Sequence, residues 1–160
     1  MANKIKSTGC YEPFDPKPWQ NKKIVWKNKA FVKDHVTCIF HIPVNMGAKI
    51  IKNMALIKKA KAKPSYQLML TDEKSSWGAD IYIDVTKQVS GAQMDKISGT
   101  FLTSVFEGPY QNAGKWAKEM QEHVKNKKQE IKKLYFSYTI CPKCAKVYGK
   151  NYVVLFAQVN

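Results

Sequence analysis

The residues best suited to chemistry in this sequence surround a Gly-Pro turn in its second half. Glu107 directly precedes Gly108-Pro109, and Tyr110 directly follows it. A carboxylate among aromatic side chains is desolvated, and it can then pair with a cationic ligand or act as a general acid or base. If a ligand is hydrolysed here, we expect Glu107 to activate water and Tyr138 to donate a hydrogen bond. The alternative is that Glu107 caps the turn or faces water.

Several aromatic side chains could form the walls of a ligand pocket. A flat ligand is held by stacking on rings and by a few polar groups. The alternative for each ring is ordinary core packing, and for His41 it is a surface or hydrogen-bonded imidazole. No Gly-x-Ser-x-Gly segment and no histidine spacing typical of a catalytic triad is present. The candidate ligand-binding residues are His41, Trp77, Tyr82, Phe106, Glu107, Tyr110 and Tyr138.

Cys141-Pro-Lys-Cys144 has the spacing of half a zinc site. Two residues between cysteines allow both thiolates to face one tetrahedral ion, but a structural site needs four ligands. Cys10, Cys38 or a histidine could complete it only if the fold brings them close. The alternative is a turn with reduced cysteines, and we expect no other cofactor.

The hydrophobic pattern predicts the elements that must position these residues. Alternating residues lead up to Glu107, and beyond the turn Ala113, Trp116, Ala117, Met120 and Val124 recur at helical spacing. The first half has the same order. We predict strands at 37–42, 66–71, 79–85, 99–107, 133–140 and 152–159. We also predict a helix that Asn45 caps and that ends near Lys63, and a second helix from 113 to 124.

This order predicts an α+β fold made of two strand-helix-strand-strand modules, residues 36–90 and 91–160. The modules would form one domain, with an antiparallel sheet and two helices on one face, and residues 1–35 would be an N-terminal arm. In the strand at 79–85, Asp80, Tyr82 and Asp84 alternate with apolar residues, which predicts one face on the core and the other towards water.

The composition limits the classes of protein. The chain has 160 residues, 44% hydrophobic residues and a net charge of +15, too apolar for a disordered protein and without an apolar run that could span a bilayer. All 27 basic residues are lysine, and lysine lacks the bidentate contacts that arginine makes to guanine and phosphate. We therefore do not expect nucleic acid as the main partner. We expect a cytoplasmic protein, with no signal peptide and no membrane insertion.

The order of elements, together with Phe106-Glu107-Gly108-Pro109-Tyr110 before the second helix, resembles the GyrI-like small-molecule-binding family. The resemblance covers residues 36–159. It implies a cleft between two modules that takes flat apolar or cationic compounds, with a buried acidic residue that meets the ligand's charge. Glu107 and Asp80 are the candidates for that acid.

Three functions follow as expectations. The first is binding of flat apolar or cationic small molecules, for sequestration or detoxification. The second, which the resemblance also implies, is hydrolysis of reactive, strained-ring electrophiles in the same pocket. The third is a basic module that binds polyanions.

Overall fold

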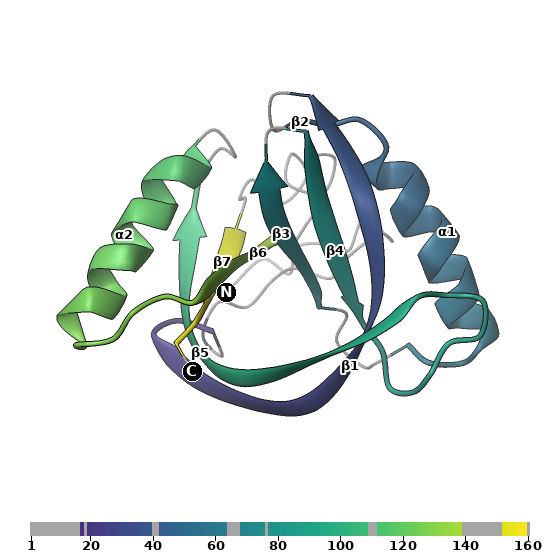
Figure 1. The fold of residues 1–160 in the computed structure, drawn as a ribbon, viewed down its shortest axis with the longest axis horizontal. Helices are drawn as coiled ribbons and strands as arrows, with labels where there is room; N and C mark the ends of the chain where they lie inside the picture. Colours follow the sequence, from purple (N-terminus) through teal and green to yellow (C-terminus); the bar gives the residue numbers. More distant parts are fainter. Residues whose placement is uncertain are drawn as a thin grey trace, which may run out of the picture. The chain divides into compact units, whose positions relative to one another are not determined.

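The computed structural model describes residues 17, 19–39, 42–63, 68–75, 77–108, 112–138 and 152–159. The α+β class and the repeated order of strand, helix, strand, strand are confirmed (Figure 1). Within these ranges the elements are β1 (Lys22–Ile39), β2 (Ile42–Pro43), α1 (Met46–Lys59), β3 (Met69–Ser75), β4 (Gly78–Asp84), β5 (Met94–Glu107), α2 (Ala113–Asn126), β6 (Lys133–Tyr138) and β7 (Tyr152–Gln158).

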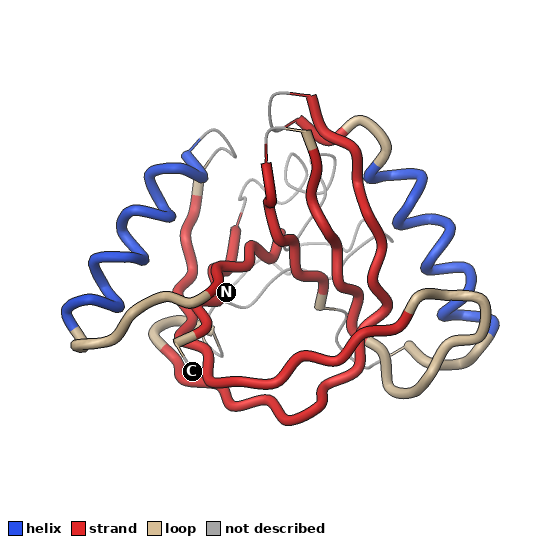
Figure 2. Tube along the Cα trace, viewed as in Figure 1, coloured by secondary structure: helices blue, strands red, loops and turns tan. Residues whose placement is uncertain are grey.

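The strands are hydrogen-bonded in the order β2-β1-β4-β3-β6-β7-β5, with a further pairing of β1 with β5. The chain divides into two compact units. The described parts of residues 1–24, 101–134 and 138–160 form one, which we call the α2 unit; residues 25–100 and 135–137 form the other, the α1 unit. The long strands β1 and β5 contribute residues to both units. Figure 2 distinguishes the strands, helices and loops in the view of Figure 1.

The α1 unit is built on the antiparallel neighbours β1, β4 and β3. Phe31 to Thr37 of β1 pair with Asp84 to Gly78 of β4, and β3 and β4 form a hairpin. One face of these strands packs against α1, because alternate residues of a strand point to the same side. The buried apolar side chains of this core include Val32, Val36, Ile57, Ile81 and Ile83.

In the α2 unit, the helix packs against β7. Trp116, Met120 and Val124 are its buried side chains, as the helical spacing predicts. β5 pairs with β7 from Phe101 opposite Gln158 to Glu107 opposite Tyr152. The helix therefore lies where the spacing of its apolar residues predicted it, with those residues buried.

Several predicted boundaries were wrong. The strand predicted to start at 37 instead starts at Lys22 and ends at Ile39, and Asn28 within it has a positive φ of 51°. A left-handed residue breaks the alternation from which a strand is recognised, and asparagine tolerates that conformation. The strand predicted at 66–71 is instead Met69–Ser75, so most of the expected polar loop before Gly78 is strand. β5 starts earlier than predicted, at Met94.

Candidate functional site

A polar and aromatic face of the α1 unit lies opposite the face that packs on α1. The register of β1 and β4 places Phe31 opposite Asp84, Lys33 opposite Tyr82, and His35 opposite Asp80. Residues directly opposite in an antiparallel pair share a face of the sheet. We call these six residues the Tyr82 face: Phe31, Lys33, His35, Asp80, Tyr82 and Asp84.

The prediction that this side of β4 faces water was wrong. Asp80 and Asp84 are each only 7% exposed and Tyr82 is 3% exposed. Every residue of β4 is buried, because the strand has β1 on one edge and β3 on the other and is covered on both faces. A strand with buried aspartates on one face brings charge into the protein interior, where it must be compensated.

Aromatic rings surround Tyr82. Its ring meets those of Phe31 and Tyr135 edge to face, with centroids 6.2 Å and 5.8 Å away. Trp26 in turn lies 5.6 Å from the ring of Phe31. Such edge-to-face contacts fix the orientation of the buried rings of Phe31, Tyr82 and Tyr135.

Two lysines compensate the two aspartates. Lys29 Nζ lies 3.0 Å from Asp84 Oδ1, and Lys33 Nζ lies 3.9 Å from Asp80 Oδ2 and 3.8 Å from Asp95 Oδ2. The same ammonium groups lie over aromatic rings: Lys33 is 5.5 Å from the centroid of Tyr82, and Lys29 is 5.7 Å from that of Phe31. The protein's own cations therefore occupy the cation-binding positions over these rings.

Burial dominates the ionisation of Asp84. Desolvation raises the pKa of its carboxyl above the ordinary value, although the hydrogen bond and charge of Lys29 act in the opposite direction. Asp84 thus holds its proton more readily than an exposed aspartate does.

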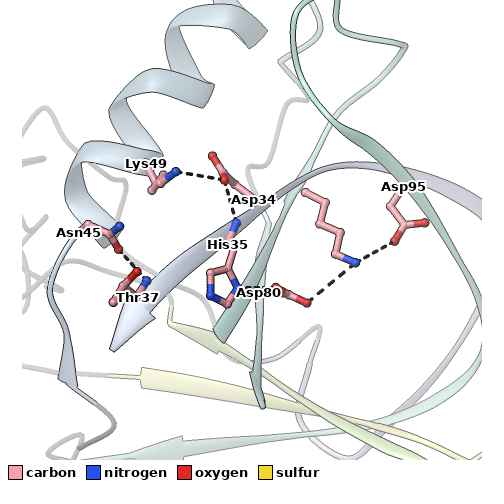
Figure 3. A network of polar contacts seen from close by, with 8 residues as sticks. Asp34, His35, Thr37, Asn45, Lys49, Asp80 and Asp95 are labelled. Carbon is pink, nitrogen blue, oxygen red and sulfur yellow. Dashed lines mark hydrogen bonds and ion pairs between the residues drawn. The ribbon is translucent and has the colours of Figure 1, made fainter. Parts of the chain in front are cut away.

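His35 and Asp80 form a pair at one end of the face (Figure 3). Nδ1 of His35 lies 3.0 Å from Oδ1 of Asp80; the histidine side chain is 61% exposed, and the aspartate side chain is 10% exposed. The imidazole lies over Gly78, where an added Cβ would be 2.8 Å from Cε1 and 3.0 Å from Nε2 of His35. The imidazole of His35 therefore fits at this position only because Gly78 has no side chain.

A second polar group ties β1 to α1 beside this pair (Figure 3). Asp34 accepts hydrogen bonds from the side chain of Asn53 and the backbone N–H of His35, both at 2.8 Å, and Lys49 Nζ lies 3.5 Å away. Burial acts to raise the pKa of Asp34, but these hydrogen bonds and the charge of Lys49 outweigh it, so the pKa is lowered. Asn45, expected to cap α1, instead accepts a hydrogen bond from the backbone N–H of Thr37.

Among the described residues, the structure brings two of the predicted site residues into this face, Tyr82 and the candidate acid Asp80. Trp77 is 59% exposed at the turn before β4. Phe106 and Glu107 belong to the α2 unit, where Phe106 stacks on Trp116 at 5.9 Å and Glu107 is exposed at the end of β5. His41, Tyr110, Cys141, Cys144 and the side chain of Tyr138 lie outside the described residues.

Sequence reasoning missed Phe31, Lys33, His35 and Tyr135 as site residues. The signal was present in the alternation of Phe31, Lys33 and His35, but this stretch was assigned to an N-terminal arm. Within the described part of the chain, no three His, Cys, Asp or Glu side chains are grouped to hold a metal ion. Neither described helix has the length and apolar character needed to cross a membrane.

Solved structures share this fold. The crystal structure of the EcmrR C-terminal domain matches 89% of this chain and 98% of its own, with a TM-score of 0.59 and 14% identity. An EcmrR–DNA complex matches 89% of this chain and 57% of its own, with a TM-score of 0.64 and 9% identity. A structure of SAV2435 bound to tetraphenylphosphonium matches 88% of this chain and 94% of its own, with a TM-score of 0.50 and 8% identity.

The fold is thus that of a GyrI-like domain, as the resemblance indicated. The chain belongs to the family described as Bacterial hydrolase, whose model matches residues 1–159. No curated protein matches it.

Proposed function

We propose that this protein binds flat, uncharged aromatic small molecules against the Tyr82 face, which would serve to sequester or detoxify them. The observation that carries the proposal is the set of partly exposed side chains beside the buried ring of Tyr82: Lys29, Lys33 and His35 are 30%, 27% and 61% exposed. The GyrI-like fold supports ligand binding, since one protein of this fold is described as bound to tetraphenylphosphonium.

The charges of the face favour uncharged ligands over cations. In SAV2435 the bound compound is a cation, whereas here Lys29 and Lys33 already neutralise Asp84 and Asp80. An organic cation would have to displace an ammonium that is both ion-paired and placed over a ring. An uncharged ring system meets no such competition, and polar groups on it can still bond to Lys33 or His35.

A titration of two matched ligand sets tests this proposal. Uncharged polycyclic aromatics and tetraphenylphosphonium are added to the full chain at low and high salt, and tryptophan fluorescence is followed. We expect saturable binding of uncharged compounds that changes little with salt. Tighter binding of the cation by the unaltered protein, or no saturable response to any uncharged compound, would contradict the proposal.

Lys33→Gln is the sharpest variant for this test. Removing the ammonium leaves Asp80 without one of its compensating charges, so affinity for tetraphenylphosphonium should rise by about tenfold or more. Lys118→Gln removes the same charge from an exposed position on α2 and is the matched control. Equal effects of the two substitutions would show that only net charge matters.

The description of the family favours a second function, hydrolysis of electrophilic small molecules. From the sequence, strained rings are the expected substrates and Glu107 and Tyr138 the expected catalytic residues, and these remain proposals. Formation of a hydrolysed product from any compound that binds in the titration would support this second function.

A further inference from the structure

We propose that His35, oriented by Asp80, is a general base with which this protein hydrolyses uncharged aromatic esters at the Tyr82 face. The proposal rests on ligand binding at that face, and it adds an activity and a catalytic group in the α1 unit. It differs from the sequence-based assignment, which placed catalysis on Glu107.

The geometry sets the roles of the two imidazole nitrogens. In the proposed arrangement Nδ1 of His35 donates its hydrogen to Oδ1 of Asp80, 3.0 Å away, because a carboxylate accepts hydrogen bonds. Nε2 is then the nitrogen that accepts a proton from water. Among the described residues Nε2 has no hydrogen-bond partner, and the side chain is 61% exposed, so water can reach it.

The buried position of Asp80 makes the pair more than a surface contact. The Asp80 side chain is only 10% exposed and also lies 3.9 Å from Lys33 Nζ, which stabilises the charge needed to hold the ring. In triad chemistry a histidine is the base, and a buried aspartate that accepts the hydrogen of Nδ1 orients it. His35 and Asp80 would take these two roles. Here water takes the place of a side-chain nucleophile.

Lys33 supplies positive charge on the same face. It lies two residues before His35 on β1, and residues two apart on a strand point to one side at a spacing of about 6.6 Å. An ester carbonyl between the two side chains would have the base on one side and an ammonium near its oxygen on the other. The ring of Tyr82, 5.5 Å from Lys33 Nζ, is buried, so the aromatic part of the ester would contact the partly exposed side chains of Lys33 and His35.

The step balances without a further reactant. The oxygen of water forms a bond to the carbonyl carbon while one of its protons passes to Nε2 of His35, and the carbonyl electron pair moves to the oxygen near Lys33. Collapse of this tetrahedral species breaks the bond to the alcohol oxygen. The proton on Nε2 passes to that oxygen, which releases the alcohol and a carboxylic acid.

Hydrolysis of p-nitrophenyl acetate by the full chain tests the proposal. Each of the 27 lysines could be acetylated once, so turnover is counted only from product well beyond 27 equivalents. We expect His35→Gln to lower the rate about a hundredfold, a typical contribution of a general base, and Asp80→Asn to lower it about tenfold. His123→Gln, a change to a histidine of the α2 unit, should leave the rate unchanged.

Gly78→Ala tests whether the position of the His35 imidazole matters, because this variant keeps the ring but displaces it. An added Cβ would lie 2.8 Å from the imidazole, so the ring must move while both reacting side chains remain. We expect about a tenfold loss of rate with little change in the melting temperature. A solvent isotope effect in the unaltered protein that disappears in His35→Gln would show that the lost step transfers a proton.

Three results would overturn the proposal. The first is a rate no faster than that of free imidazole at equal concentration. The second is an unchanged rate in a His35→Gln variant with a normal circular dichroism spectrum, and the third is loss of turnover in Glu107→Gln but not in His35→Gln. The fluorescence titration is read separately. Binding without turnover removes only this inference, whereas turnover without saturable binding of uncharged aromatics removes the proposed function.

Discussion

The surroundings of two aspartates of the α1 unit shift the pKa of their carboxyl groups in opposite directions. Asp34 lies beside α1 with several donors and Lys49 around its carboxyl, and its pKa is lowered. Asp84 lies on the Tyr82 face with Lys29 as its ion-pair partner, yet burial dominates and its pKa is raised. A buried ion pair loses hydration that a single partner does not fully replace.

This contrast predicts opposite pH dependences for two matched variants. Because the folded-state pKa of Asp84 is raised, its contribution to the free energy of unfolding is present below its unfolded pKa and is lost as pH rises through the folded value. The stability of the unaltered protein relative to Asp84→Asn should therefore fall from pH 3 to pH 7. Relative to Asp34→Asn it should rise over the same range. Urea unfolding at several pH values measures both, and parallel trends would contradict the assignment.

At the scale of elements, Trp116 is one of the three side chains that α2 buries. Trp116 is 4% exposed and stacks on Phe106, with an interplanar angle of 25°. Trp116→Ala should lower the free energy of unfolding by about 3 to 5 kcal/mol, because it removes a buried ring and leaves a cavity. Lys118→Ala, at an exposed position of the same helix, should change it by less than about 0.5 kcal/mol. Urea titration compares the two, and equal stabilities would show that the helix buries another side.

The same helix shows what could be predicted from sequence. The spacing of Trp116, Met120 and Val124 identified α2 and its buried face, because an amphipathic helix repeats its apolar residues over several turns. β1 carries a weaker signal. Lysines alternate with its apolar residues and Asn28 interrupts the period, so residues 24–32 indicated at most a short extra strand and the region was assigned to an N-terminal arm.

The candidate site was less predictable than the fold because it depends on pairing between strands. The alternation in β4 showed that Asp80, Tyr82 and Asp84 share a side, but not that this side is buried. The burial of this side depends on which strands flank β4 and on what covers the face. Neither can be deduced from a single sequence. His35 meets Asp80 across 45 residues of chain, through a register fixed only on folding.

At the scale of the whole molecule, the net charge of +15 is the strongest competitor to a small-molecule function. Polyanion binding through lysines releases counterions, so it weakens steeply with salt. The ion pairs of the Tyr82 face, in contrast, are formed within the protein by Lys29 with Asp84 and by Lys33 with Asp80 and Asp95, and contacts between uncharged rings depend little on salt.

Salt therefore separates the two functions in one protein sample. We expect the chain to bind a fluorescent DNA duplex at 50 mM salt and to lose about a thousandfold in affinity by 200 mM, without preference for sequence. Affinity for the tightest uncharged aromatic should change by less than about twofold over this range. Submicromolar, sequence-dependent binding of DNA at 200 mM salt would instead make the lysine surface the functional site. The reason for expecting otherwise is chemical: every basic side chain here is lysine, a hydrated point charge without the bidentate geometry that reads bases.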